Sequence, residues 1–329
     1  MKESIYIHAT GKAWSFAWSH KKLWLFGAFA AFLGQFGMVE FLGKLGVDTV
    51  GSGGYMVSAG SVLSQIGSFI ANAGYSYDSK IVLSFLLALM LAIFAVFIFL
   101  AVVSQGLLLY VSAESIKNKN INIVKAWYIG TANFWRLFFL NFFKKIIISL
   151  IIIIFSLSAY GVLLTPSIAN SIFLTLVVIL LALVGLVLSF LFFYSAGYLV
   201  IEKESLSVAV QKAWIMFVKH PLVSFEIGLL IVILNLFFGA ITAFGFILAI
   251  LPAILIWFAI AMAGGSFIAL TAALIASIIV FTMYLIVAGA GFTVFTTYIW
   301  TYAFLEMHDT GLKSKIIHFV NYLRGIKNR

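Results

Sequence analysis

The sequence predicts an all-α, polytopic membrane protein with about six membrane-spanning helices. Hydrophobic residues make up 64% of its 329 residues, and charged residues make up only 9%. Many apolar runs exceed the roughly 18 residues that mark a candidate transmembrane helix. A soluble domain of this size could not bury so much apolar surface. We therefore expect one integral membrane domain over residues 1–329.

Charge and cysteine content exclude several other classes of protein. The net charge is +10, but lysines that flank membrane spans set orientation and need no nucleic-acid partner. No basic patch alternates with base-stacking aromatic residues, so nucleic acid is not an expected partner. The chain has no cysteine, which excludes disulfides, thiol nucleophiles and cysteine-ligated metals. The first apolar run starts only at Leu23, which does not fit a cleavable signal peptide.

The N-terminal part predicts a helix in the membrane interface, followed by a first span. Residues 4–20 are too polar to span, and their apolar residues recur at helical spacing. Tryptophans in this stretch fit the aromatic belt at headgroup level, and Lys21-Lys22 mark the cytoplasmic side. The first span is expected at about residues 23–45, with Glu40 near its outer end. The Gly- and Ser-rich residues 46–79 are expected outside, with a short amphipathic helix.

Two further runs flank a polar connector. The second run, residues 80–112, would be about 50 Å long as a helix and must tilt, kink or project beyond a ~30 Å core, with Gly106 as a place to bend. The third run is interrupted by Lys144-Lys145. Because lysines are costly at the bilayer centre, residues 134–145 are expected to stay interfacial, with the span at about 146–164. The alternative places both lysines on a polar pathway.

The remaining sequence allows two topologies. The apolar runs here are residues 168–201, 222–263 and 266–305. If residues 241–263 cross the membrane separately, the chain has seven spans. If they form a re-entrant or external segment broken at Pro252, it has six. The distribution of Lys and Arg favours six spans, with both termini and a basic C-terminal interfacial helix, residues 311–325, in the cytoplasm.

Short motifs recur in the same order and predict a threefold repeat. Each even-numbered span ends in Tyr-x-x-x-Glu, at Tyr110 and Glu114, Tyr198 and Glu202, and Tyr302 and Glu306. An aromatic residue follows twelve or thirteen positions later, at Trp127, Trp214 and Phe319. The predicted unit is an interfacial helix and two spans, over about residues 4–116, 117–204 and 205–308.

We interpret the Tyr-Glu pairs and the tryptophans first as structural elements. A tyrosine at headgroup level and a glutamate one turn later would form a hinge that fixes the next interfacial helix. The alternative is a ring of three carboxylates that binds a cation or a basic partner. The expected interfacial anchors are Trp14, Trp18, Trp127 and Trp214.

One join between spans resembles a known group of membrane proteins. Residues 198–221 place Glu202, Ala209, Ala213-Trp214 and Lys219 between two apolar runs. This pattern resembles the joins of prokaryotic multi-pass proteins that include the membrane domain fused to some glycerophosphodiester phosphodiesterases. The resemblance implies a helical domain of undefined activity in a prokaryotic cytoplasmic membrane. The hydrolase's catalytic domain is not part of the match.

Catalytic and metal-binding motifs are not found in the sequence. The five histidines lack metal-binding spacing, and no nucleophile elbow or Walker loop occurs. We expect no enzyme, no metal and no cofactor.

Polar residues within apolar runs are the candidates for a membrane site. They are Glu226, Asn141, Lys144, Lys145, Asn235, Gln105 and Glu40. Glu226, with Asn141 at the matching position of the repeat, is expected to line a cytoplasm-facing cavity. The alternative is a packing carboxylate paired with Lys219 or His220.

Two functions follow from these patterns. Interfacial helices, tryptophan belts and few buried charges favour a membrane scaffold or lipid-interacting protein, whose partners are membrane lipids. Internal repeats and over-long spans favour a transporter or channel for a small or lipid-like solute. A polar cavity lined by Glu226, Asn141 and Lys144 would favour transport, and a lipid-filled groove or dry bundle would favour the scaffold. The sequence also leaves open whether the chain has a protein partner or forms a homo-oligomer.

Overall fold

The computed structural model describes residues 5–33, 77–164, 167–263 and 267–310, and the regular structure in these ranges is entirely helical. The helices are α1 (Ile5–Ser19), α2 (Leu23–Ala31), α5 (Tyr77–Ile116), α6 (Ile123–Ala132), α7 (Phe134–Leu164), α8 (Ile168–Val200), α9 (Leu206–Lys219), α10 (Pro221–Ala263) and α11 (Phe267–Thr310). Five of them, α5, α7, α8, α10 and α11, are long and apolar enough to cross a membrane. The predicted all-helical class is confirmed for this part of the chain.

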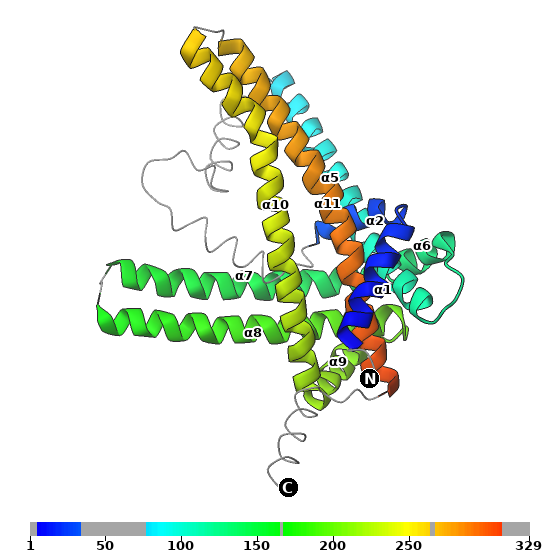
Figure 1. Cartoon of the computed structure of the whole chain (residues 1–329). Helices are drawn as coiled ribbons and strands as arrows, with labels where there is room; N and C mark the ends of the chain where they lie inside the picture. The colour runs from blue at the N-terminus through cyan, green and yellow to red at the C-terminus, as the bar shows by residue number, and fades with distance from the viewer. Residues whose placement is uncertain (1–4, 34–76, 165–166, 264–266, 311–329) are drawn as a thin grey trace, which may run out of the picture.

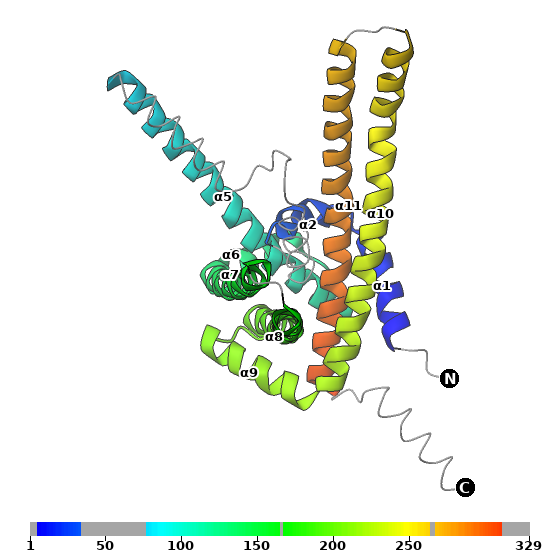
Figure 2. The ribbon, with the colours of Figure 1, turned by 90° about the vertical axis from the view of Figure 1, so that its left-hand side faces the viewer.

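The long helices diverge from one packed centre (Figure 1). Helices α7 and α8 lie side by side and antiparallel, and so do α10 and α11, while α5 extends in a third direction (Figures 1 and 2). We call the diverging parts the arms. They comprise residues 77–100, 142–164, 168–189, 229–263 and 267–289.

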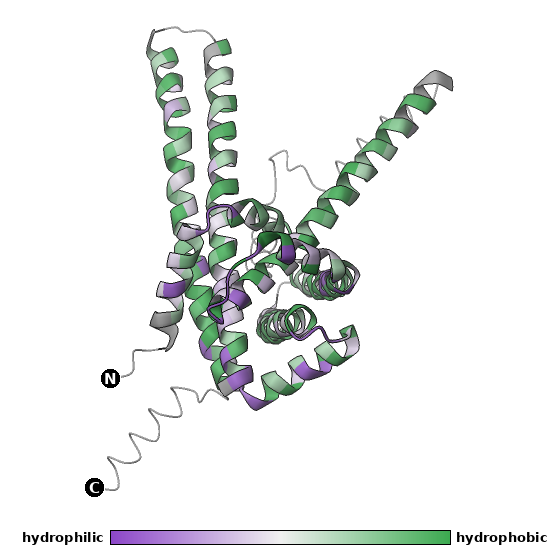
Figure 3. Ribbon diagram, turned by 90° about the vertical axis from the view of Figure 1, so that its right-hand side faces the viewer, coloured by the Kyte–Doolittle hydropathy of each residue, from purple (hydrophilic) through white to green (hydrophobic). Residues whose placement is uncertain are grey.

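We call the packed centre the hub. It comprises α1, α2, α6 and α9 together with residues 101–116, 134–141, 190–200, 221–228 and 290–310 of the long helices. Most of the buried residues of the described chain lie in the hub, including Tyr194, Phe304 and Leu107. The arms are hydrophobic along nearly their whole length, and hydrophilic residues gather at the hub (Figure 3).

Side-chain caps begin two of the helices, the short α6 and the long α8. The side chain of Asn122 accepts a hydrogen bond from the backbone N–H of Lys125 over 3.0 Å, which begins α6. Ser167 does the same for the N–H of Asn170 at the start of α8. Such caps satisfy amide groups that have no partner within the helix. Each short helix then buries an alanine completely: Ala13 in α1, Ala126 in α6 and Ala213 in α9.

Glycines allow two close helix crossings in the hub. A Cβ atom at Gly27 of α2 would lie 2.3 Å from the carbonyl oxygen of Ala290 in α11. A Cβ atom at Gly106 of α5 would lie 3.2 Å from the Cα atom of Gly130 in α6. Small residues let membrane helices approach in this way. Gly106, expected as a place to bend, lies within the continuous helix α5 and forms this close contact with α6.

One sequence prediction about a helix boundary is wrong. Helix α10 runs through Pro252 without a break, so residues 241–263 continue the preceding run. A proline inside a membrane helix is tolerated where neighbouring groups compensate for its missing N–H. Helix α7 runs through Lys144-Lys145 as one continuous helix, and the expected interfacial position of residues 134–145 stays a prediction.

Other expected segments lie outside the described residues. They are the outer part of the first span with Glu40, the amphipathic helix within residues 46–79, and the C-terminal helix 311–325 with Phe319.

Candidate functional site

A polar cavity lies where the arms leave the hub. It encloses about 60 Å³, and its lining comes from five helices. The polar lining residues are Gln105 of α5, Asn141 and Lys144 of α7, Ser189 of α8, Asn235 of α10 and Thr296 of α11. Its apolar wall includes Phe192, Phe193 and Trp300. A polar cavity of this size has room for a few water molecules.

An amide pair between two helices orders one side of the cavity. The Nδ2 atom of Asn141 donates to Oε1 of Gln105 over 2.6 Å, and also to the backbone oxygen of Leu137 over 2.8 Å. The second contact fixes the amide orientation, because two acceptor oxygens would repel at that distance. The oxygen of Gln105 is therefore the acceptor in this contact, and its Nε2 atom carries the two amide hydrogens.

The other polar lining residues bond their own helices. Ser189 donates to the backbone oxygen of Gly185 over 2.8 Å, Thr296 to that of Phe292 over 2.9 Å, and Asn235 to that of Ile231 over 2.8 Å. Asn235 retains a second amide hydrogen. Among the described lining residues, Lys144 carries the charge, and none is acidic. The lining therefore offers none of the carboxylate ligands that a metal cation such as Ca²⁺ or Mg²⁺ prefers.

The structure brings together only part of the predicted membrane site. Asn141, Lys144 and Asn235 line the cavity, whereas Glu226 and Lys145 do not. Glu226 is half-buried on α10, and Lys145 is exposed on α7. Counting eight residues from Asn133 and from His220 pairs Asn141 with Gly228 rather than with Glu226. The lining of this cavity includes Asn141 but not Glu226, and the expectation that the two residues line one cytoplasm-facing cavity stays a prediction.

Three of the expected tryptophan anchors stand next to a buried alanine. Trp14, Trp18 and Trp214 are about half exposed, and Trp127 is partly buried. Three of them directly follow the fully buried Ala13, Ala126 and Ala213. Each of these alanines directly follows a lysine, at Lys12, Lys125 and Lys212. The alanine thus faces the hub, and the tryptophan is presented outward.

The Tyr-Glu pairs lie at the hub ends of three long helices. The ammonium of Lys125 in α6 is 5.7 Å from the ring centre of Tyr110, and that of Lys212 in α9 is 5.9 Å from the ring of Tyr198. These are cation–π distances. A side-chain hydrogen bond with Tyr110 raises the pKa of Lys125 above its ordinary value.

The three glutamates of these pairs differ in their settings. Glu114 lies 3.7 Å from Lys119, Glu202 is exposed just beyond α8, and Glu306 is half-buried in α11.

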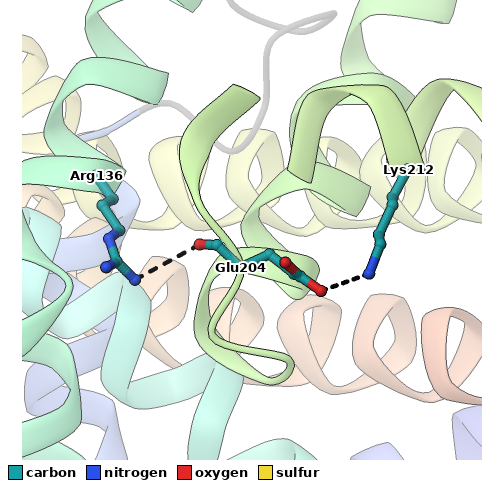
Figure 4. A network of polar contacts seen from close by, with 3 residues as sticks. All are labelled: Arg136, Glu204 and Lys212. Carbon is teal, nitrogen blue, oxygen red and sulfur yellow. Dashed lines mark hydrogen bonds and ion pairs between the residues drawn. The ribbon is translucent and has the colours of Figure 1, made fainter. Parts of the chain in front are cut away.

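A polar network fixes the join between α8 and α9 (Figure 4). Lys212 forms an ion pair with the carboxylate of Glu204, and Arg136 at the start of α7 donates to the backbone oxygen of Glu204 over 3.5 Å. The preceding residue, Lys203, has a φ of 58°, so the chain turns through the left-handed region. This network ties α7 and α9 to the loop that connects α8 with α9.

A buried tyrosine–serine contact was not singled out by the sequence. The hydroxyl groups of Tyr194 in α8 and Ser224 in α10 are 2.9 Å apart, and both residues are completely buried. Ser189, Thr296 and Trp300 of the cavity were also missed. Hydroxyl residues are common within apolar helices because they can bond their own backbone, so single ones give no signal of a shared site.

Comparisons of the chain with protein-family models, with curated proteins and with solved structures find no match. Among the described residues, no group of three His, Asp or Glu side chains is placed to hold a metal ion.

Proposed function

We propose that the chain is a non-enzymatic integral membrane protein that acts as a lipid-interacting scaffold. In this proposal the hub lies at the cytoplasmic interface of a prokaryotic membrane, and the arms cross the hydrocarbon. Both ends of the chain are then cytoplasmic, because α1 belongs to the hub and α11 ends there. Membrane lipids are the partners, and catalysis has no part in the proposal.

The distribution of burial carries this proposal. In the most apolar 18-residue stretch of each long helix, only 6 to 22% of the residues are buried. The side chains of the arms therefore need lipid or another apolar surface to cover them. The hub, in contrast, covers its apolar residues with its own helices.

The lengths of the arms support the same placement. Four of the five arm segments, residues 77–100, 142–164, 168–189 and 267–289, are 22 to 24 residues long. At 1.5 Å per residue they measure about 33–36 Å, close to a ~30 Å hydrocarbon core. The over-long runs of the sequence are then explained, because their last turns belong to the hub. Lys144-Lys145 fall at the hub end of an arm, where lysines reach the interface at low cost.

Contacts between the short and long helices support a threefold repeat within this scaffold. Helix α6 packs on α5, α9 packs on α8, and α1 packs on α11. Each short helix therefore contacts the second long helix of the unit before it, with the first unit following the last. The lysine, alanine and tryptophan shared by α1, α6 and α9 fit this arrangement. The resemblance to membrane domains fused to glycerophosphodiester phosphodiesterases stays a prediction.

A transporter is the second candidate, and the polar cavity is the observation that favours it. Asn141 and Lys144 line the cavity as expected for a polar site, but Glu226 does not. The cavity holds only a few waters and is walled by Phe192, Phe193 and Trp300. These features favour an enclosed binding site over a conduction path.

Reconstitution into liposomes tests the proposed function against transport. We expect spin-labelled phospholipid to show a motionally restricted fraction, because the arms are lipid-covered. We expect phosphate and chloride flux to equal that of protein-free liposomes. A flux above this background that is lost in Lys144→Met would replace the scaffold by a transporter. Absence of a restricted lipid fraction would contradict the scaffold itself.

A further inference from the structure

Three tryptophans form an aromatic cluster at the bend between α1 and α2. The ring centres of Trp14 and Trp18 are 5.6 Å apart, and those of Trp18 and Trp24 are 5.3 Å apart. The indole N–H of Trp24 donates to the backbone oxygen of Ala17 over 2.8 Å, which ties the start of α2 to the end of α1. Trp14 and Trp18 are 59% and 46% exposed, so the cluster presents two indole rings on the surface of the hub.

Positive charge lies beside this cluster. Lys21 and Lys22 stand in the bend itself and are exposed. The ammonium of Lys21 is 5.6 Å from the ring centre of Trp18, a cation–π distance. Residues 5–33, all of them described, contain these two lysines and Lys12 but no Asp or Glu. Helices α1 and α2 therefore supply only positive charge to this surface, which favours a negatively charged ligand.

An exposed apolar strip, formed by Leu25 and Phe32, leads from the lysines along α2. Leu25 lies one turn after the two lysines and Phe32 two turns after Leu25, so these residues share one helix face. Leu25 and Phe32 are 63% and 60% exposed. The ring centre of Phe32 is 4.7 Å from that of Phe97, which belongs to the α5 arm. The strip therefore connects the lysines of the hub with a helix segment that the proposed function places in hydrocarbon.

An anionic phospholipid matches both the charge and the apolar strip of this surface. Its phosphate attracts ammonium groups, and indole rings favour the headgroup level of a bilayer. Its acyl chains can cover the exposed apolar side chains. A soluble anion would leave the strip uncovered. A second copy of the chain that docked here through the same face would bring like charges together, which is unfavourable.

We propose that the bend between α1 and α2 binds an anionic phospholipid. Lys21 and Lys22 neutralise its phosphate, the exposed rings of Trp14 and Trp18 lie beside its headgroup, and an acyl chain follows the strip to the α5 arm. The inference rests on the proposed lipid-interacting function and names the class of lipid.

Photolabelling in liposomes tests this site. The full chain would be reconstituted in phosphatidylcholine that contains a trace of photoreactive phosphatidylglycerol or photoreactive phosphatidylcholine, each with the same diazirine in one acyl chain. Labelled residues would be located by mass spectrometry. We expect phosphatidylglycerol to label residues 25–32 about ten-fold more than phosphatidylcholine does, because lysines near a membrane surface favour anionic lipid.

Pairs of lysines provide matched variants. Lys21→Gln with Lys22→Gln should reduce labelling by phosphatidylglycerol to the level of phosphatidylcholine. Lys117→Gln with Lys119→Gln is the control, because it removes the same charge from exposed positions between α5 and α6. It should stay within about two-fold of wild type. Lys21→Arg with Lys22→Arg should retain the labelling, which separates a loss of charge from misfolding.

The other outcomes would overturn the site in different ways. Equal labelling by both lipids, or unchanged labelling in Lys21→Gln with Lys22→Gln, would leave an apolar surface without preference for charge. Inorganic phosphate that abolishes the preference at millimolar concentration would assign the lysines to a soluble anion. No labelling by either lipid, in a chain that is dimeric, would assign this face to a second copy. If the site fails while the restricted lipid fraction in liposomes persists, the scaffold stands. If that fraction is also missing, both fail.

Discussion

The ring of Phe16 lies 4.7 Å from the ring of Tyr298, and this contact joins the first described helix to the last. Trp14 adds an edge-on contact to Phe295, with ring centres 6.0 Å apart. Helix α1 therefore packs on α11, although the contacting residues lie about 280 positions apart in the sequence. The hub is closed by this contact in the same manner as α6 on α5 and α9 on α8.

Cross-linking tests whether α1 packs on α11. In the cysteine-free chain, Phe16→Cys with Tyr298→Cys should be joined by a short bifunctional thiol reagent. A protease site introduced between α5 and α6 would then release two fragments that stay linked. Gly11→Cys with Tyr298→Cys is the control, because nothing lies within 4 Å of a Cβ atom at Gly11. Equal linkage in both pairs, or none in the first, would contradict the packing of α1 on α11.

The α2–α11 crossing should tolerate no side chain at Gly27. A Cβ atom there would meet the backbone oxygen of Ala290, which cannot move aside as a side chain can. We expect Gly27→Ala to destabilise the chain by about 1–3 kcal/mol, measured by unfolding in detergent. Gly289→Ala is the control, since its Cβ atom would have open space, and it should leave stability unchanged or slightly higher. A wild-type midpoint for Gly27→Ala would refute the close crossing.

The contact between Tyr194 and Ser224 should show a measurable coupling energy. Tyr194→Phe and Ser224→Ala each remove one of two buried hydroxyl groups that partner each other. Hydrogen bonds inside membrane proteins contribute about 0.6 kcal/mol on average and up to about 1.7. A double-mutant cycle should give a coupling in this range. Tyr160→Phe, at an exposed position of α7, should change nothing. Strictly additive single effects would argue against the bond.

The arms should draw together in a bilayer. They diverge in several directions (Figures 1 and 2), yet arms of about 33–36 Å can cross a ~30 Å core only at moderate tilt. Spin labels at Ser167→Cys and Ile268→Cys would report the separation of two arm ends by pulsed electron resonance. We expect a shorter distance in lipid nanodiscs than in detergent. The same distance in both media would mean that the hub holds the arms rigidly apart.

The sequence predicted the helical class, a helix within residues 4–20 and the Ala-Trp positions of the short helices, because these depend on composition and local spacing. It could not locate the boundary between hub and arm. Residues 101–113 are buried by protein except for the half-buried Tyr110, and residues 84–96 are exposed, yet both stretches are rich in apolar residues. Lipid and protein interiors favour the same side chains, so periodicity does not separate them.

The sequence predicted only some of the residues that line the cavity. Asn141, Lys144 and Asn235 stand out in apolar runs because polar groups are costly there. Glu226 also stands out in the sequence but does not line the cavity. Which polar residues line the cavity depends on how its five helices cross. Those crossings are set by contacts such as Gly27 with Ala290, which are distant in the sequence.

Labelling of single cysteines in intact cells tests the central claim most directly, since the natural chain has none. The variants are Ser167→Cys at an arm end, Ile179→Cys on an exposed arm face and Ser207→Cys on α9 in the hub. With a membrane-impermeant maleimide, we expect only Ser167→Cys to react in intact cells. After the membranes are opened, Ser207→Cys should also react with the maleimide. Ile179→Cys should react only after the protein is unfolded. Labelling of Ser207→Cys in intact cells, or of Ile179→Cys in folded protein, would contradict a lipid-embedded arm and a cytoplasmic hub.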